Sequence, residues 1–162
     1  MTEFHLRRIG IPPSHPEVGN CLRLKNHNNA RTTFGRDTSQ SHYIDSTQYE
    51  RLISRRQAEI TCLETQNGAL QFVLKDMSLN GTYVNDVRVN GQCVLNSGDC
   101  VTFGHIQGVK ISPGQYAPQK NSEVKFVFEE VTEDNQSLEP EILAQTSQTV
   151  QTQIIIIWMG DV

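Results

Sequence analysis

The stretch LKDMSLNGTYVN, residues 74–85, combines the end of one β-strand, a turn and the start of the next. A short apolar run over residues 70–74 leads into it, and β-branched and aromatic residues follow the turn. Asn80-Gly81 provides two residues that tolerate a positive φ, which a tight reversal of the chain requires. We therefore expect two strands here, joined by a polar loop.

The same pattern recurs over the first 131 residues, where helical periodicity is almost absent. Turn signals such as Asn67-Gly68 and Asn85-Asp86 separate short β-type segments. Many short strands joined by frequent turns indicate an all-β sandwich or barrel. The expected strands are Phe4–Ile9, Thr32–Phe34, Ala58–Leu63, Leu70–Leu74, Thr82–Asn85, Val87–Val89, Cys100–Phe103 and Val124–Phe128.

Loops and a tail complete the expected organisation. Proline and glycine predict loops at residues 12–20 and 111–122, and we expect the second to be an insertion without a functional role. Past Val131 the composition turns to Gln, Thr, Ser and Glu, so residues 1–131 are expected to form the domain and residues 132–162 a mostly disordered tail. The final apolar run, Ile154–Met159, has three possible interpretations. It is a peptide that docks on a partner, a strand that adds to the edge of a sheet, or a chain end without a defined role.

Charge is divided unevenly between these parts. The 162-residue chain has a net charge of -4, but residues 1–131 hold all 14 Lys and Arg against 13 acids, and the tail holds five acids. With 36% hydrophobic and 20% charged residues the composition is globular and excludes a multi-span membrane protein. A nearly neutral body without interleaved aromatic and basic residues does not favour nucleic-acid binding.

Neither metal nor catalytic chemistry is indicated. The four cysteines, Cys21, Cys62, Cys93 and Cys100, form no CxxC pair, so we expect free, mostly buried thiols in a reducing compartment. The five histidines are dispersed, and the common sequence patterns of nucleophile, metal and cofactor sites are missing. We therefore expect no metal site, no cofactor and no enzymatic activity.

Polar side chains instead gather in three loops next to strands. Gly35-Arg36-Asp37, Ile53-Ser54-Arg55-Arg56 and Ser78-Leu79-Asn80-Gly81-Thr82 offer guanidinium forks, hydroxyls and an amide, which suit an oxyanion on a peptide. Solvated surface arginines are the alternative that composition leaves open. If segments 31–34, 42–45, 57–63 and 70–75 simply alternate in direction, loops 46–56 and 76–81 fall at one end of the sandwich and loop 35–41 at the other. Either His42–Asp45 is too short to cross the sandwich or it changes sheets, and strand counting alone does not show that the three loops converge.

The segments FGRD, LISRRQAEI, LKDMSLNGTYVN and LNSGDCVTFG follow one another in the order and at the spacing of the forkhead-associated (FHA) domain. Residues 4–131 resemble this family. The resemblance implies an eleven-stranded, two-sheet β-sandwich of the SMAD/FHA type that binds phosphothreonine peptides through loops at one end.

The resemblance also assigns site residues, with two departures from the family pattern. The family's SRxH ends in His where this chain has Gln57, whose amide can still donate and accept, and Leu79 occupies a position where polar residues are frequent. The assigned residues are Arg36, Ser54 and Arg55 for the phosphate, Asn80 and Arg55 for the peptide backbone, and Gly35, Gln57, Gly81 and Thr82 for the shape of the loops.

What the resemblance implies is a non-catalytic module that binds phosphothreonine segments of partner proteins in nuclear signalling, transcription or DNA-damage and cell-cycle regulation. A phosphate-independent interaction scaffold with a degenerate pocket is the alternative. The segments FHLRRIG and NDVRV look like those of nuclear, chromatin-associated, transcription-factor-like members, so we expect the nucleus, and otherwise the cytoplasm, as the location.

The chain also contains dipeptides that resemble substrates of kinases that phosphorylate Ser or Thr before Gln. In the tail, Thr152-Gln153 predicts self-association, because a phosphorylated Thr152 could bind the site of its own or a second chain. Thr47-Gln48 and Thr65-Gln66 lie in the body. Chance occurrence in a chain rich in Gln, Ser and Thr is the alternative.

Overall fold

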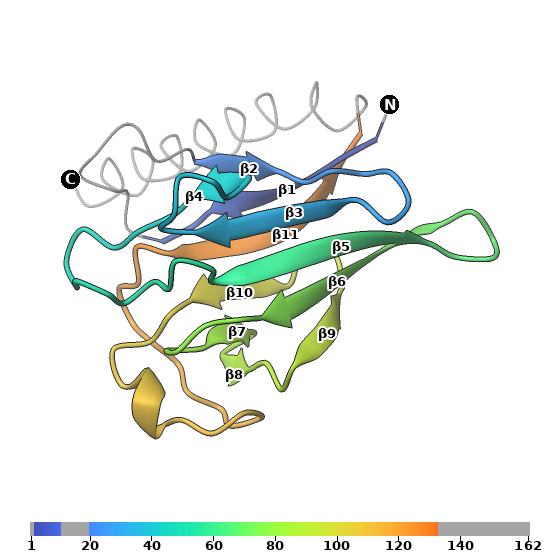
Figure 1. Ribbon diagram of the computed structural model, residues 1–162. Helices are drawn as coiled ribbons and strands as arrows, with labels where there is room; N and C mark the ends of the chain where they lie inside the picture. Colours follow the sequence, from blue (N-terminus) through green and yellow to red (C-terminus); the bar gives the residue numbers. More distant parts are fainter. Residues whose placement is uncertain (1, 11–19, 133–162) are drawn as a thin grey trace, which may run out of the picture. The chain divides into compact units, whose positions relative to one another are not determined.

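The computed structural model describes residues 2–10 and 20–132 (Figure 1). Glu3–Glu130 form one compact unit built from two sheets, with the strand orders β2-β1-β11-β10-β7-β8 and β4-β3-β5-β6-β9. The predicted eleven-stranded, two-sheet β-sandwich is confirmed. The strands are β1 Glu3–Arg8, β2 Cys21–Arg23, β3 Arg31–Gly35, β4 His42–Tyr43, β5 Ala58–Glu64, β6 Leu70–Asp76, β7 Thr82–Val84, β8 Val87–Arg88, β9 Gln92–Leu95, β10 Cys100–Phe103 and β11 Lys125–Val131.

Phenylalanine side chains fill the space between the sheets. All six phenylalanines of the chain are buried. Phe4 on β1 meets Phe72 on β6 with ring centroids 4.4 Å apart, and Phe34 on β3 stacks on Phe103 of β10 at 5.4 Å. Each pair joins one sheet to the other. Aromatic pairs of this kind add about 0.5–1.5 kcal/mol to the free energy of burial, so the core fixes how the sheets pack.

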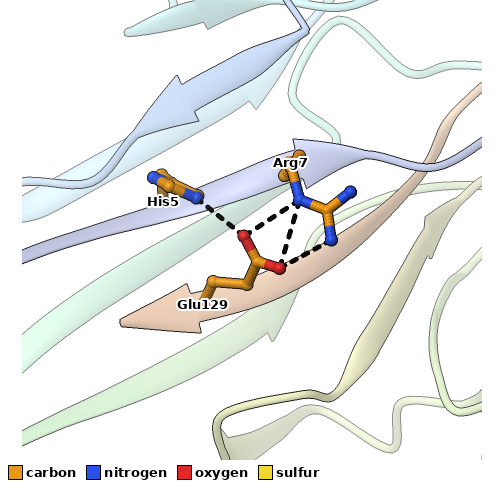
Figure 2. A network of polar contacts seen from close by, with 3 residues as sticks. All are labelled: His5, Arg7 and Glu129. Carbon is orange, nitrogen blue, oxygen red and sulfur yellow. Dashed lines mark hydrogen bonds and ion pairs between the residues drawn. The ribbon is translucent and has the colours of Figure 1, made fainter. Parts of the chain in front are cut away.

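An ion-pair network links β1 to β11, which are neighbours in the first sheet (Figure 2). Glu129 receives hydrogen bonds from Arg7 Nε and Nη2, the shortest at 2.7 Å, and lies 2.9 Å from His5 Nε2. The Arg7 hydrogen bonds are the main reason that the pKa of Glu129 is lowered, although burial opposes them. The network therefore stabilises the folded chain while Glu129 is ionised.

The turn residues have the backbone geometry that the sequence predicts. Asn85 and Asp86 both have positive φ, at 51° and 67°, and connect β7 to β8 as a two-residue hairpin in which Val84 pairs with Val87. Three strands, β2, β4 and β9, are missing from the strands predicted by periodicity. They have two to four residues, and β9 has a single buried side chain, so no alternation reveals them.

Some of the predictions fall on segments outside the described residues, and others on the cysteines. Residues 11–19 and 133–162 lie outside the described residues, so the loop predicted at 12–20 is described only at Asn20, and the tail, its apolar run and Thr152 are not described beyond Thr132. All four cysteines are free thiols, as predicted, but only Cys62 is buried and Cys21 is exposed. Within the described ranges there is no helix long and apolar enough to cross a membrane.

Candidate functional site

Three polar loops meet at one end of the second sheet. Phe34 pairs with Ala58 in antiparallel β3 and β5, and Ala58 pairs with Asp76 in antiparallel β5 and β6. The end of β3, the start of β5 and the end of β6 therefore lie side by side. This register brings the loops after β3, before β5 and after β6 to the same edge, on the left of Figure 1.

Of the two explanations given for loop 35–41, the structure supports the first, that His42–Asp45 is too short to cross the sandwich. Strand counting places the loop at the far end only if residues 42–45 form a strand that crosses in the opposite direction. Instead β4 has two residues and runs parallel to β3, with Phe34 opposite His42. The chain after β3 makes a short loop and returns beside the strand it has just left, so it does not cross the sheet.

Arg36 is held against the loop before β5. Its backbone N–H donates to Ser54 O at 3.2 Å, and its Nε donates to Ile53 O at 2.8 Å. Gly35 makes this approach possible, because a Cβ at that position would overlap the carbonyl of Arg55. The Nε bond fixes the guanidinium, and no hydrogen bond from its terminal nitrogens is found among the described residues. The predicted phosphate ligands Arg36 and Ser54 are thus neighbours.

The hydroxyl of Ser54 is oriented by the loop after β6. The backbone N–H of Leu79 donates to Ser54 Oγ at 3.0 Å. Because a hydroxyl has one hydrogen to donate, accepting this bond leaves that hydrogen for another acceptor, and none is found within the described residues. Ser54 is half-buried and Arg55 beside it is exposed. Ser54 can therefore offer a directed donor at the surface.

The buried amide of Gln57 holds two of the loops together by hydrogen bonds. Its side chain is 0% exposed and uses both ends of the amide. Oε1 accepts from Ser54 N at 2.9 Å, while Nε2 donates to Gly81 O at 2.8 Å and to Thr82 Oγ1 at 3.0 Å. A neutral histidine ring has one donor and one acceptor, so it could make two of these three bonds. Gln57 therefore connects the loop before β5 to the loop after β6 without a histidine.

The loop after β6 is organised by Asp76. Its Oδ1 accepts hydrogen bonds from the backbone and hydroxyl of Ser78 and from Thr82 Oγ1, at 2.7 to 3.1 Å. Thr82 is buried and lies between Asp76 and Gln57. Gly81 has φ 91°, and a Cβ there would also meet the ring of Tyr83. Gly81 and Thr82 therefore shape the loop after β6.

Asn80 makes structural contacts that the sequence does not predict. Its Nδ2 donates to the carbonyls of Arg51 and Leu52, both at 3.1 Å, so both amide hydrogens stabilise the neighbouring loop. Its Oδ1 accepts no hydrogen bond from the described residues and is the atom that a peptide N–H could use. Leu79 beside it is 70% exposed. The Asn80 side chain thus directs its Nδ2 hydrogens to the loop before β5.

The segment between β10 and β11, which includes the loop predicted at 111–122, has a structural role at this site. Glu123, 4% exposed, accepts from Thr47 N at 2.7 Å and Thr47 Oγ1 at 2.6 Å, and also from Ser46 Oγ and Gln48 N. Burial alone would raise the pKa of Glu123, but these hydrogen bonds outweigh it and lower the pKa. The ionised carboxylate therefore anchors the loop over residues 46–48.

Two further contacts attach the segment between β10 and β11 to the loop after β6. Gly108 packs so closely on Asn80 that a Cβ would overlap its carbonyl. Arg88 donates to the carbonyl oxygens of Gly108, Ile111 and Leu79 at 2.5 to 3.2 Å. Sequence reasoning missed Glu123 and Arg88, because a lone Glu before a strand and a lone Arg in a short hairpin give no pattern.

An open depression lies next to Arg36. Its lining contains three guanidinium groups and two carboxylates, so its charge is about +1 although the chain is acidic overall. Backbone and hydroxyl groups between them can accept or donate hydrogen bonds. The lining residues are Arg36, Asp45, Ser46, Thr47, Gln48, Glu50, Arg51 and Arg55.

Comparison with known families agrees with this geometry. Residues 32–104, which include Arg36, Ser54, Gln57 and Asn80, match the family model of the FHA domain. The chain contains an FHA domain. FHA domains are modules that recognise phosphothreonine peptides, and no catalytic family is indicated. The described residues form no group of three or more His, Cys, Asp or Glu that could hold a metal ion.

Relatives of this FHA domain occur in longer proteins and in solved structures. The Caenorhabditis elegans protein Germ layers disorganized gldi-3 is 32% identical over 104 residues, which are 60% of this chain and 11% of that protein. The chain therefore spans about a tenth of that curated relative's length.

Two solved yeast structures share the fold. The Dun1 FHA domain, in complex with a doubly phosphorylated (pT) peptide derived from Rad53 SCD1, is 23% identical with a TM-score of 0.53, and the match covers 80% of this chain and 75% of that chain. Full-length Pml1p is 20% identical with a TM-score of 0.54, over 81% and 82%.

Proposed function

We propose that this FHA domain binds phosphothreonine in extended segments of partner proteins and performs no reaction. The observation that carries the proposal is the pairing of Arg36 with Ser54, whose loops are joined by a direct backbone hydrogen bond. Arg36 supplies the charge and Ser54 an oriented hydroxyl. Arg55 is exposed beside them, and Asn80 Oδ1 offers an acceptor to the peptide backbone.

The ligand's charge explains why binding should depend on phosphorylation. A phosphothreonine carries about -1.5 to -2 charge at pH 7, with a second pKa near 6, whereas threonine has no charge to pair with arginine. Affinity should therefore fall as the pH drops below about 6. Preference for phosphothreonine over phosphoserine would rest on one buried methyl group, or about 0.8 kcal/mol.

Calorimetric titration tests the proposal. The ligands are degenerate peptide pools with a central Thr, phosphothreonine or phosphoserine, and the proteins are the wild-type chain and Arg36→Ala. We expect binding of the phosphothreonine pool alone or best, with a loss of about 2–5 kcal/mol in the variant, because a desolvated phosphate loses its counter-charge. Equal binding of the unphosphorylated pool would instead favour the phosphate-independent scaffold.

The cellular setting is a separate part of the proposal. A nuclear location and a role in signalling, transcription or DNA-damage and cell-cycle regulation rest only on the segments FHLRRIG and NDVRV. Both segments also have structural roles, since Arg8 donates to the carbonyl of Glu123 and Arg88 to that of Leu79. Imaging of a fluorescent fusion of the full chain tests this part, and exclusion from the nucleus would contradict it.

A further inference from the structure

We propose that Thr47 is a phosphorylation site whose phosphate occupies the depression next to Arg36 and thereby blocks the binding of a phosphopeptide. This inference rests on the proposed function and adds its regulation. Thr47-Gln48 is a dipeptide of the kind that Gln-directed Ser/Thr kinases modify, and both residues are exposed. The same two residues line the depression that contains Arg36, Arg51 and Arg55.

The modification transfers the γ-phosphoryl group of a nucleoside triphosphate to Thr47. A bond forms between Thr47 Oγ1 and the γ-phosphorus, the bond from that phosphorus to the bridging oxygen breaks, and the nucleoside diphosphate leaves. The hydroxyl proton passes to the base of the kinase. The product is a phosphothreonine built into the rim of a phosphothreonine pocket.

Charge alone makes the modified pocket a poor receptor. Arg36, Arg51 and Arg55 line the depression together with Asp45 and Glu50, which gives a charge of about +1. A phosphate on Thr47 adds about -1.5 to -2 at pH 7, so the sign of the charge reverses. An incoming phosphopeptide then meets a negative depression.

The hydrogen bonds of Thr47 determine which way the modified loop moves. Thr47 Oγ1 donates its single hydrogen to Glu123 Oε2 at 2.6 Å, and Thr47 N donates to Glu123 Oε1 at 2.7 Å. Phosphorylation removes the hydroxyl donor and sets a dianion against this buried carboxylate, so the 46–48 segment is repelled from Glu123. The arginines of the depression are the opposite charges within its reach.

A tethered phosphate also competes efficiently with one in solution. Because Thr47 and the arginines belong to the same short region, the effective concentration of its phosphate at the pocket is of the order of millimolar. A phosphopeptide that binds in the micromolar range must displace it. Phosphorylation of Thr47 is therefore a switch that turns recognition off.

The chain offers a matched control in Thr65-Gln66. Thr65 is exposed, like Thr47, and precedes a glutamine. It lies in the turn after β5, where its N–H donates to Ala69 O at 2.8 Å, and this turn is at the opposite end of β5 from Ala58 and the pocket. A phosphate on Thr65 adds the same charge to the protein without reaching the arginines.

The experiment uses the full chain with phosphothreonine installed genetically at position 47 or at position 65. Fluorescence anisotropy with the degenerate phosphothreonine peptide pool reports binding. We expect the chain modified at Thr47 to bind at least about 10-fold more weakly than the unmodified chain, and the chain modified at Thr65 to bind within about 2-fold of it. Equal binding by the two modified chains would overturn the switch.

A second readout separates this inference from the proposed function. In ³¹P NMR, arginines near the phosphate should lower the second pKa of phosphothreonine 47 below that of phosphothreonine 65, and Arg51→Gln should reduce the difference. Identical titrations would overturn capture of the phosphate by the pocket. If the unmodified chain fails to bind the peptide pool while the ³¹P difference persists, the proposed function fails and the intramolecular capture stands.

Discussion

Replacement of Gln57 by methionine tests whether this buried amide holds the recognition loops in place. The substitution nearly conserves volume but removes the hydrogen bonds to Ser54 N, Gly81 O and Thr82 Oγ1. Two of the three partners keep another bond, because Gly81 O also accepts from Gly104 N and Thr82 Oγ1 donates to Asp76. Ser54 N loses the single partner found for it among the described residues.

The expected magnitude follows from this inventory. An orphaned, partly buried N–H costs about 1–3 kcal/mol, and each of two lost bonds with satisfied partners costs about 0.5–1.5 kcal/mol. We therefore expect Gln57→Met to lower the free energy of unfolding by about 2–6 kcal/mol. The phosphopeptide affinity should also fall, since Ser54 is the residue that the amide positions.

Two further variants of Gln57 separate hydrogen bonding from packing. Gln57→His keeps one acceptor and one donor, so we expect a loss of about 1 kcal/mol and no gain in affinity. Gln57→Glu sets a carboxylate against Gly81 O, which favours the neutral acid and raises its pKa. Relative to wild type its stability should be preserved at low pH and lost as the pH rises through that raised pKa.

Urea unfolding followed by fluorescence measures all three variants, and anisotropy measures their affinity for the phosphothreonine peptide pool. The reasoning is refuted if Gln57→Met unfolds within about 0.5 kcal/mol of wild type, a difference typical of surface substitutions. It is also refuted if Gln57→Glu shows the same pH dependence as wild type.

Two other predictions rest on contacts described above, and a third rests on the sequence of the tail. Gly35→Ala should destabilise the fold by about 1–3 kcal/mol in urea unfolding, because its Cβ overlaps the carbonyl of Arg55; unchanged stability would contradict the close approach. The pKa values of Glu123 and Glu129 are lowered in the folded chain, so stability should be full above about pH 4.3, the unfolded value, and should decline as the pH falls through the folded values. Glu123→Gln should flatten that decline. Phosphorylation of Thr152 should raise the mass seen by light scattering in a concentration series, and a constant mass would exclude self-association through it.

Much of the fold could be predicted because its determinants are local. The asparagine-glycine turns and the alternating apolar residues of β5 and β6 are visible in the sequence and hold in the structure. The parallel pairing of β4 with β3 could not be predicted, since two residues carry no periodicity and their partner lies eight positions earlier. Because the β4 segment does not cross the sheet, β5 runs antiparallel to β3, and this pairing places Arg36 next to Ser54.

The family resemblance was more informative than strand counting about the site, but it did not give the working partners of each side chain. It assigns Asn80 to the peptide backbone but does not show that the amide hydrogens of Asn80 bind the carbonyls of Arg51 and Leu52. It also marks Gln57 as a departure from the His of the family pattern. Counting donors and acceptors in the structure shows that the amide makes one more bond than a neutral imidazole could.

The insertion between β10 and β11 shows why loop residues are hard to assign from one sequence. Glu123 is 76 positions from Thr47, so no local pattern connects them, and its burial contradicts the usual exposure of glutamate in loops. The four hydrogen bonds that compensate for this burial all come from residues 46–48. A buried carboxylate that is satisfied by a single loop fixes that loop as long as every donor remains. Loss of one donor, by mutation or by phosphorylation of Thr47, therefore loosens residues 46–48, which line the depression next to Arg36.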